Sequence, residues 1–136
     1  MAKDPAFTRR PNMGLTLSAS RISTANTNRD GTGTIATILT AGQDGTRVDR
    51  VQWKATGVTT AGVVRLYVVD AAATIRLLAE ALVSAITPSA TIKSAEGEFV
   101  RTDGQPLILL EPGMILKAST HNAESFDVLP VVAGDF

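Results

Sequence analysis

Alternating hydrophobic and polar residues from 47 to 70 constrain the fold of this chain more than any other feature. The segment reads RVDRVQWKATGVTTAGVVRLYVVD, with two β-type runs on either side of a turn of small residues. In the first run Val51, Trp53 and Ala55 share one face, and the second run alternates in the same way. A period of two is typical of half-buried antiparallel strands, because successive side chains point to opposite sides.

Shorter β-type runs recur along the rest of the chain, separated by turn signals. Asp44-Gly45 predicts a hairpin between the run before it and the run that begins at residue 47. Gly97 lies inside an alternating run and predicts a bulge or a close backbone approach, while Pro130 predicts an edge strand. The further strands are expected at residues 15–22, 34–40, 91–101, 107–110, 114–120 and 125–132.

Residues 71–83 fit two structures. Ala, Leu, Glu and Arg favour a helix, and Ile75, Leu78 and Leu82 have helical spacing. The same stretch fits a turn over Ala71–Ala73 followed by a strand from Thr74 to Val83. We favour the strand, because the neighbouring segments all have β-type patterns.

Length and composition predict one soluble domain. The chain has 136 residues, of which 44% are hydrophobic and only 4% aromatic, so its core is expected to be mainly aliphatic. The net charge is zero, which argues against a dedicated nucleic-acid-binding protein. Cysteine is absent, which excludes disulfides and thiolate metal sites. We see no signal peptide and no membrane-spanning run, so synthesis in the cytosol is expected.

These patterns predict an all-β, single-domain antiparallel β-sandwich over residues 15–136, with a jelly roll as the natural arrangement of eight or nine strands. Residues 1–14 are broken by prolines and a glycine and predict an extended N-terminal arm. Such an arm would contact a neighbouring subunit through apolar anchors and basic groups. The candidate contact residues are Lys3, Phe7, Arg9, Arg10 and Met13.

Charge is distributed unevenly between the two ends. Residues 1–21 carry four basic side chains against Asp4 alone, and residues 111–136 carry four acidic side chains against Lys117 alone. This asymmetry is compatible with docking to other subunits and equally with solvated termini.

Residues suited to chemistry are few. His121 is the only histidine, which leaves no histidine cluster for a metal and no G-x-S-x-G nucleophile for a triad. Glu96 and Glu98 share a face of a predicted strand, and a carboxylate pair of this kind could hydrolyse a glycoside or hold a cation. We favour ion pairs between these glutamates and Arg65, Lys93 or Arg101.

Three other motifs are interpreted as structural. Trp53 is expected in the core, where its indole N–H needs a partner, rather than on a sugar-binding surface. GTGTIA at residues 31–36 matches the letters of a dinucleotide fingerprint, but a β-branched run follows it where the motif needs a helix. Arg29-Asp30-Gly31 spells a cell-adhesion tripeptide and is too short to be specific. No catalytic residue, cofactor or metal is therefore predicted.

The segments ISTANTNRDGTGTIATILTAGQDGTRVDRVQWKATGVTTAGVVRLYVVD and TDGQPLILLEPGMILKASTHNAESFDV resemble small virion proteins of tailed double-stranded DNA phages. The chain is most similar to the jelly-roll cement, or decoration, proteins, over residues 20 to 130. The likeness lies in the chain length, in the spacing of the predicted strands and in short local sequences. It offers no residue-level contact motif.

The resemblance implies a non-enzymatic protein that binds the outside of a phage capsid, associates with itself as a dimer or trimer near a symmetry axis, and bridges major capsid protein subunits. It implies no contact with nucleic acid or membrane. Two other classes stay open. One is another virion component, or a receptor- or carbohydrate-binding β module such as part of a fibre. The other is a small β-fold hydrolase that uses Glu96 and Glu98.

Overall fold

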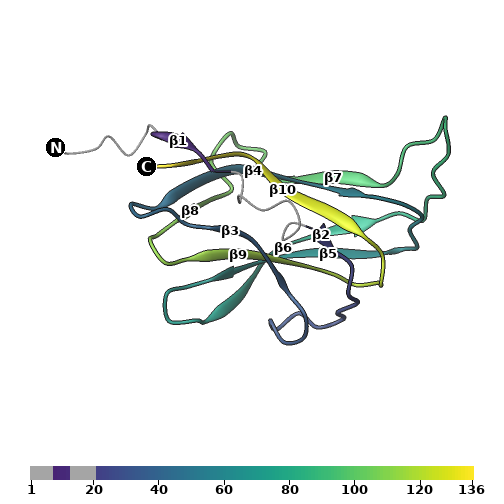
Figure 1. Ribbon diagram of the computed structural model, residues 1–136, viewed down its shortest axis with the longest axis horizontal. Coiled ribbons are helices and arrows are strands. Elements are labelled where there is room, and N and C mark those ends of the chain that lie inside the picture. The colour runs from purple at the N-terminus through teal and green to yellow at the C-terminus, as the bar shows by residue number, and fades with distance from the viewer. Residues whose placement is uncertain (1–7, 13–20) are drawn as a thin grey trace.

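The computed structural model describes residues 8–12 and 21–136, and its regular structure is entirely β. Two antiparallel sheets form two layers, an upper and a lower one in Figure 1. An all-β chain with two antiparallel sheets was the expectation, and it is confirmed. The strands are β1 (Arg10–Pro11), β2 (Arg21–Ile22), β3 (Ala36–Thr40), β4 (Thr46–Ala55), β5 (Gly62–Val69), β6 (Ile75–Val83), β7 (Glu96–Val100), β8 (Ile108–Leu110), β9 (Ile115–Thr120) and β10 (Phe126–Asp135).

The chain crosses repeatedly from one sheet to the other. The six-stranded sheet has the order β1-β10-β4-β7, with β2 also paired to β10 and β8 also paired to β4. The four-stranded sheet has the order β3-β9-β5-β6. Strands that follow one another along the chain therefore lie mostly in different layers, and among the strands of the described residues only β5 and β6 pair directly with their neighbour in sequence.

The hairpin predicted at Asp44-Gly45 is wrong. β3 pairs with β9 and β4 pairs with β10, so the turn carries the chain from one sheet to the other. Gly45 has a φ of 93°, which glycine adopts without strain, and a Cβ there would lie 2.7 Å from the Leu110 carbonyl oxygen. The Asp-Gly pair thus marks a reversal of direction, while burial of both strands decides which sheet each one joins.

The core lies between the layers and follows the predicted alternation of β4. Val51, Trp53 and Ala55 are buried as predicted, and Trp53 meets Phe126 edge-on with ring centroids 6.0 Å apart. Val48 is buried as well, because the alternation changes phase between Val48 and Val51, where the register with β10 shifts. Aliphatic side chains fill most of the remaining space, as the composition predicts. The buried face that the sequence predicts for Val51, Trp53 and Ala55 is therefore confirmed.

Residues 75–83 form a strand, which settles the ambiguity of that stretch. The Asp70 carboxylate accepts hydrogen bonds from the backbone N–H groups of Ala72 and Thr74, both at 2.9 Å, and so closes a turn. Ala73 has a φ of 65° within this turn. The turn fixes where β6 begins, and pairing along β5 outweighs the helical propensity of its residues.

Two other expectations need correction. The strand expected over 91–101 is limited to β7, because residues 91–95 lie in the loop that precedes it and Arg101 follows its end. β10 is not an edge strand, since it pairs with β4 on one side and with β1 and β2 on the other. Pro130 instead lies where the register with β4 shifts between Leu129 and Val132, so the missing N–H falls at a bulge.

The outer face of the four-stranded sheet is covered along β5 by another part of the chain. Arg65 and Tyr67 on β5 are fully buried, although they point away from the core. Arg65 donates from Nη1 to the Asn26 carbonyl at 2.9 Å, and the Tyr67 hydroxyl donates to the Asn28 carbonyl at 2.9 Å. The polar loop between β2 and β3 therefore folds over β5 on the outer side of this sheet, whereas Leu82 on the same side of β6 stays 86% exposed.

Candidate functional site

The predicted contact residues are only partly described. Lys3, Phe7 and Met13 lie outside the described residues, whereas Arg9 and Arg10 belong to a short segment that runs along the end of β10. Arg9 donates its backbone N–H to the Asp135 carbonyl, and β1 pairs Arg10 with Asp135. Within the stretch predicted as an arm, Arg10–Pro11 thus form a strand of the six-stranded sheet.

Asp135 holds this segment against the fold. Its Oδ1 accepts hydrogen bonds from Asn12 Nδ2 at 2.8 Å and from Thr46 Oγ1 at 2.7 Å. Its Oδ2 lies 3.7 Å from Arg10 Nε, and the carboxylate is only 14% exposed. The basic beginning and the acidic end of the chain therefore meet within one molecule, as the Arg21–Asp127 pair at 2.7 Å also does.

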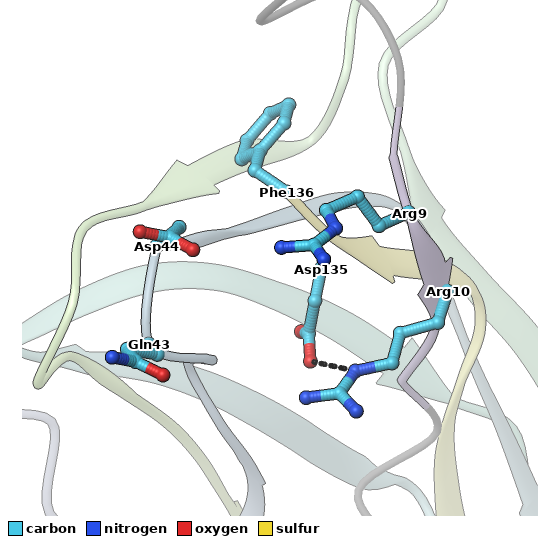
Figure 2. Close-up of a pocket in the computed structure, with 6 residues that line it drawn as sticks. All are labelled: Arg9, Arg10, Gln43, Asp44, Asp135 and Phe136. Atoms are coloured by element: carbon cyan, nitrogen blue, oxygen red, sulfur yellow. Dashed lines mark ion pairs between the residues drawn. The ribbon is translucent and has the colours of Figure 1, made fainter. Parts of the chain in front are cut away.

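A pocket of about 340 Å³ lies beside these contacts. Figure 2 shows Arg9, just before β1, and Arg10, in β1, on the same side of the pocket as Asp135, with the turn that carries Gln43 and Asp44 on the opposite side. Phe136 closes the pocket at the end of the chain. Because both signs of charge line it, the pocket suits contact with a polar protein segment better than capture of a single anion or cation.

His121 is part of the buried arginine network. Its Nδ1 lies 3.3 Å from Arg65 Nη2, and Arg65 Nε lies 3.2 Å from Glu80. Arg29 approaches the same Glu80 oxygen at 2.9 Å. The hydrogen bond from Arg29 is the main cause that lowers the pKa of Glu80, and the charges of Arg29 and Arg65 add to it. Arg65 and Glu80 thus bind the loop between β2 and β3 to the sheet, through the Asn26 carbonyl and Arg29.

The two candidate glutamates form separate ion pairs. Glu96 lies 3.0 Å from Lys54 and 3.7 Å from Lys93, and the hydrogen bond from Lys54 is the main cause of its lowered pKa. Glu98 lies 3.3 Å from Arg50. Lys93 was among the predicted partners, while the other two predicted cations pair elsewhere, because the strand opposite β7 is β4.

Trp53 is a core residue, with 3% of its surface exposed. Its Nε1 has no hydrogen-bond partner in the part of the chain that the structure describes, so the partner expected for it is missing there. Directly opposite, a Cβ on Gly97 would lie 2.6 Å from Trp53 Cζ2, which confirms the close approach predicted at that glycine. Trp53 therefore offers no stacking surface to a sugar.

The remaining motifs are structural. Arg29 of the adhesion-like tripeptide pairs with Glu80, and Asp30 closes a turn by accepting from the Thr32 N–H and hydroxyl. The Thr32 hydroxyl is the main cause that lowers the pKa of Asp30. GTGTIA runs directly into β3, and no helix follows it.

One surface was missed at the level of sequence: the outer face of the six-stranded sheet. Arg21, Asp127, Lys54 and Glu96 lie directly opposite one another in a row across β2, β10, β4 and β7. All four are between 34% and 57% exposed. Four residues earlier along β4, on the same face, a second exposed row is formed by Val132, Arg50 and Val100. The alternation within each strand hints at this face, but the order of the strands is needed to assemble it.

Comparison of the chain with family models, with curated proteins and with solved structures gave no match. Within residues 8–12 and 21–136, no group of three or more histidine or carboxylate side chains is arranged to hold a metal ion. The same part of the chain contains no helix long and apolar enough to cross a membrane.

Proposed function

We propose that this protein is a capsid cement protein, a jelly-roll module that binds the outer surface of a phage head and bridges major capsid protein subunits. One observation carries the proposal. The side chains most suited to chemistry are held in intrachain contacts, while one broad sheet face is left uncovered by the described residues. A protein whose task is to grip neighbours needs a rigid body and an accessible surface, and it needs no active site.

The strand order supports the jelly-roll assignment. If β1 and β2 are taken as one first strand and β7 and β8 as one sixth strand, the two sheets have the orders 1-8-3-6 and 2-7-4-5. Two interlocked Greek keys produce this arrangement in jelly rolls. The fold and the resemblance of the sequence to cement proteins are thus compatible.

A carbohydrate-binding module is less well supported. The chain has six aromatic residues, of which Trp53, Tyr67, Phe99 and Phe126 are buried. Phe136 is half-buried at the end of the chain. An exposed aromatic platform, which sugar recognition commonly uses, is not formed by these five residues.

Cement proteins work by mass action. A protein that binds the assembled shell but not the free subunits stabilises the shell by an amount that grows with its concentration. Many copies on a symmetric lattice add avidity when neighbours also touch one another. On this view the protein is located on the virion exterior, after synthesis in the host cytoplasm, and its partners are the major capsid protein and other copies of itself.

Binding to expanded capsids tests the proposal. The purified protein is mixed with expanded capsids of the phage that encodes it, and bound protein is measured by co-sedimentation. We expect saturable binding at a fixed number of copies per capsid protein. Absence of binding to expanded capsids at saturating protein concentration would contradict the proposal.

The contribution of the chain's beginning needs a careful variant. Deleting residues 1–14 would also remove β1, so deletion of residues 1–7 and the substitution Arg9→Ala are better tests. We expect each to weaken binding, with Arg76→Ala on the opposite sheet as the control for loss of an exposed arginine. Unchanged binding in both variants would remove Lys3, Phe7 and Arg9 from the contact surface.

A further inference from the structure

The two sheets of this sandwich differ in what covers them. Arg65 and Tyr67 on the outer side of the four-stranded sheet are fully buried beneath the loop between β2 and β3. The corresponding side of the six-stranded sheet carries side chains that are one third to more than one half exposed. Among the described residues, the charged row on this open side is accessible to a partner on all four of its strands. On the four-stranded sheet the accessible part lies along β6, where Leu82 is 86% exposed.

The charges on the open side alternate across four strands. In the row defined above, Arg21 pairs with Asp127 at 2.7 Å and Lys54 pairs with Glu96 at 3.0 Å. Read from β2 to β7 the signs are plus, minus, plus, minus. The row spans three strand spacings, or about 14 Å.

This order of charges is complementary to itself. A two-fold axis parallel to the strands, between β10 and β4, would reverse the row on a facing copy. Arg21 would then face Glu96 of the second copy, and Asp127 would face Lys54 of the second copy. Each charge gains a further partner of opposite sign, which is the condition for an isologous interface.

The size of the face and its apolar residues are adequate for such a contact. Four strands by the ten residues of β4 give a projected area of about 600 Å², and stable interfaces bury about 800 Å² of accessible surface per partner. Val100, Leu109 and Val132 are exposed large aliphatic residues on this same face, at 38%, 57% and 45%. Their burial would supply the apolar part of the interface.

We infer that the outer face of the six-stranded sheet binds a second copy of this chain, face to face about a two-fold axis, through the row Arg21–Asp127–Lys54–Glu96. The inference deepens the proposed function, because it names the surface through which copies associate. Dimerisation is measured without capsids. Loss of self-association and loss of capsid binding can therefore be told apart.

Charge swaps that preserve the ion pairs within one chain isolate the contact between chains. In R21E/D127R the first ion pair is kept with its signs exchanged, but facing positions then carry like charges. K54E/E96K does the same with the second pair. The quadruple variant R21E/D127R/K54E/E96K reverses the whole row and is again complementary to itself, although not to the wild-type chain.

Sedimentation velocity over a concentration series measures the dimer dissociation constant. We expect a wild-type dimer that weakens with added salt, and either double swap should raise the dissociation constant by about tenfold or more. The quadruple variant should return to within about threefold of wild type and should not form mixed dimers with it. Circular dichroism checks that every variant is folded.

Three results would overturn the inference. A wild-type chain that stays monomeric at the highest soluble concentration means that the row serves only cross-strand stability. Double swaps that dimerise as the wild type does would place the interface elsewhere. Mixed dimers of wild type and the quadruple variant, as strong as either homodimer, would exclude the facing arrangement.

Discussion

Replacing Gly97 by alanine is expected to lower the free energy of unfolding by about 2 kcal/mol, because the new methyl group overlaps a rigid ring in a packed core. The added Cβ would lie 2.6 Å from Trp53 Cζ2 and 2.9 Å from Trp53 Nε1. Trp53 is 3% exposed and packs against Phe126, so the indole has little room to move away. Urea unfolding followed by circular dichroism measures the change.

Gly57 provides the matched control. A Cβ on Gly57 would meet no atom within 4 Å, so Gly57→Ala should change stability little. The substitution Trp53→Leu removes the overlapping atoms, and Gly97→Ala should therefore cost much less in that background. An equal cost of Gly97→Ala with and without the tryptophan would contradict this explanation.

Glu80→Gln is expected to destabilise the protein by about 2 kcal/mol at neutral pH, since it removes the carboxylate that faces the fully buried Arg65. The full penalty for breaking a buried ion pair is not expected, because the Glu80 side chain is 33% exposed and Arg65 keeps its bond to the Asn26 carbonyl. Chemical denaturation at a series of pH values measures the difference.

The pH dependence of this difference has a definite sign. The hydrogen bond and charge of Arg29, together with Arg65, lower the pKa of Glu80 in the folded state. A carboxyl whose pKa is lowered by folding adds stability above its unfolded pKa of about 4.3, and this stability is lost as the pH falls through the folded pKa. Wild type and Glu80→Gln should therefore converge in acid.

Glu98→Gln is the control for loss of a surface carboxylate. Glu98 and Arg50 are each nearly half exposed, so their pair should contribute less than about 1 kcal/mol. If Glu98→Gln destabilised the protein as much as Glu80→Gln does, burial of Arg65 would not explain the effect. A gap between wild type and Glu80→Gln that widened in acid would contradict the sign given above.

Local pattern was sufficient to predict the β class and several individual elements. The period of two placed Val51, Trp53 and Ala55 correctly in the core, and the surroundings of residues 71–83 correctly favoured a strand. Gly97 was correctly expected at a close backbone approach. Each of these features depends on a few consecutive residues or on one strand and its direct neighbour.

Features that depend on strand order could not be predicted. Asp44-Gly45 reverses the chain, but nothing in the turn specifies that β3 and β4 join different sheets. Pro130 was assigned to an edge because the bulge that accommodates it depends on pairing with β4. Burial of Arg65 follows from a loop that folds back over β5 from nearly 40 residues away in sequence.

The candidate site shows the same division. Arg9 and Arg10 were selected as contacts to a neighbouring subunit, which stays a prediction, and the structure places both beside Asp135 of the same chain, at the other end of the sequence. The alternating row across four strands needed the register of β2, β10, β4 and β7, which no single segment encodes.

The central proposal is that this protein stabilises a capsid shell by binding to it, and the stability of the shell tests this proposal most directly. Expanded capsids that lack the protein are heated with and without a saturating amount of it, and disassembly is followed by light scattering. The account predicts a higher disassembly temperature that rises with protein concentration, as expected for a ligand of the assembled state alone. An unchanged disassembly temperature at full occupancy of the capsid would contradict the account.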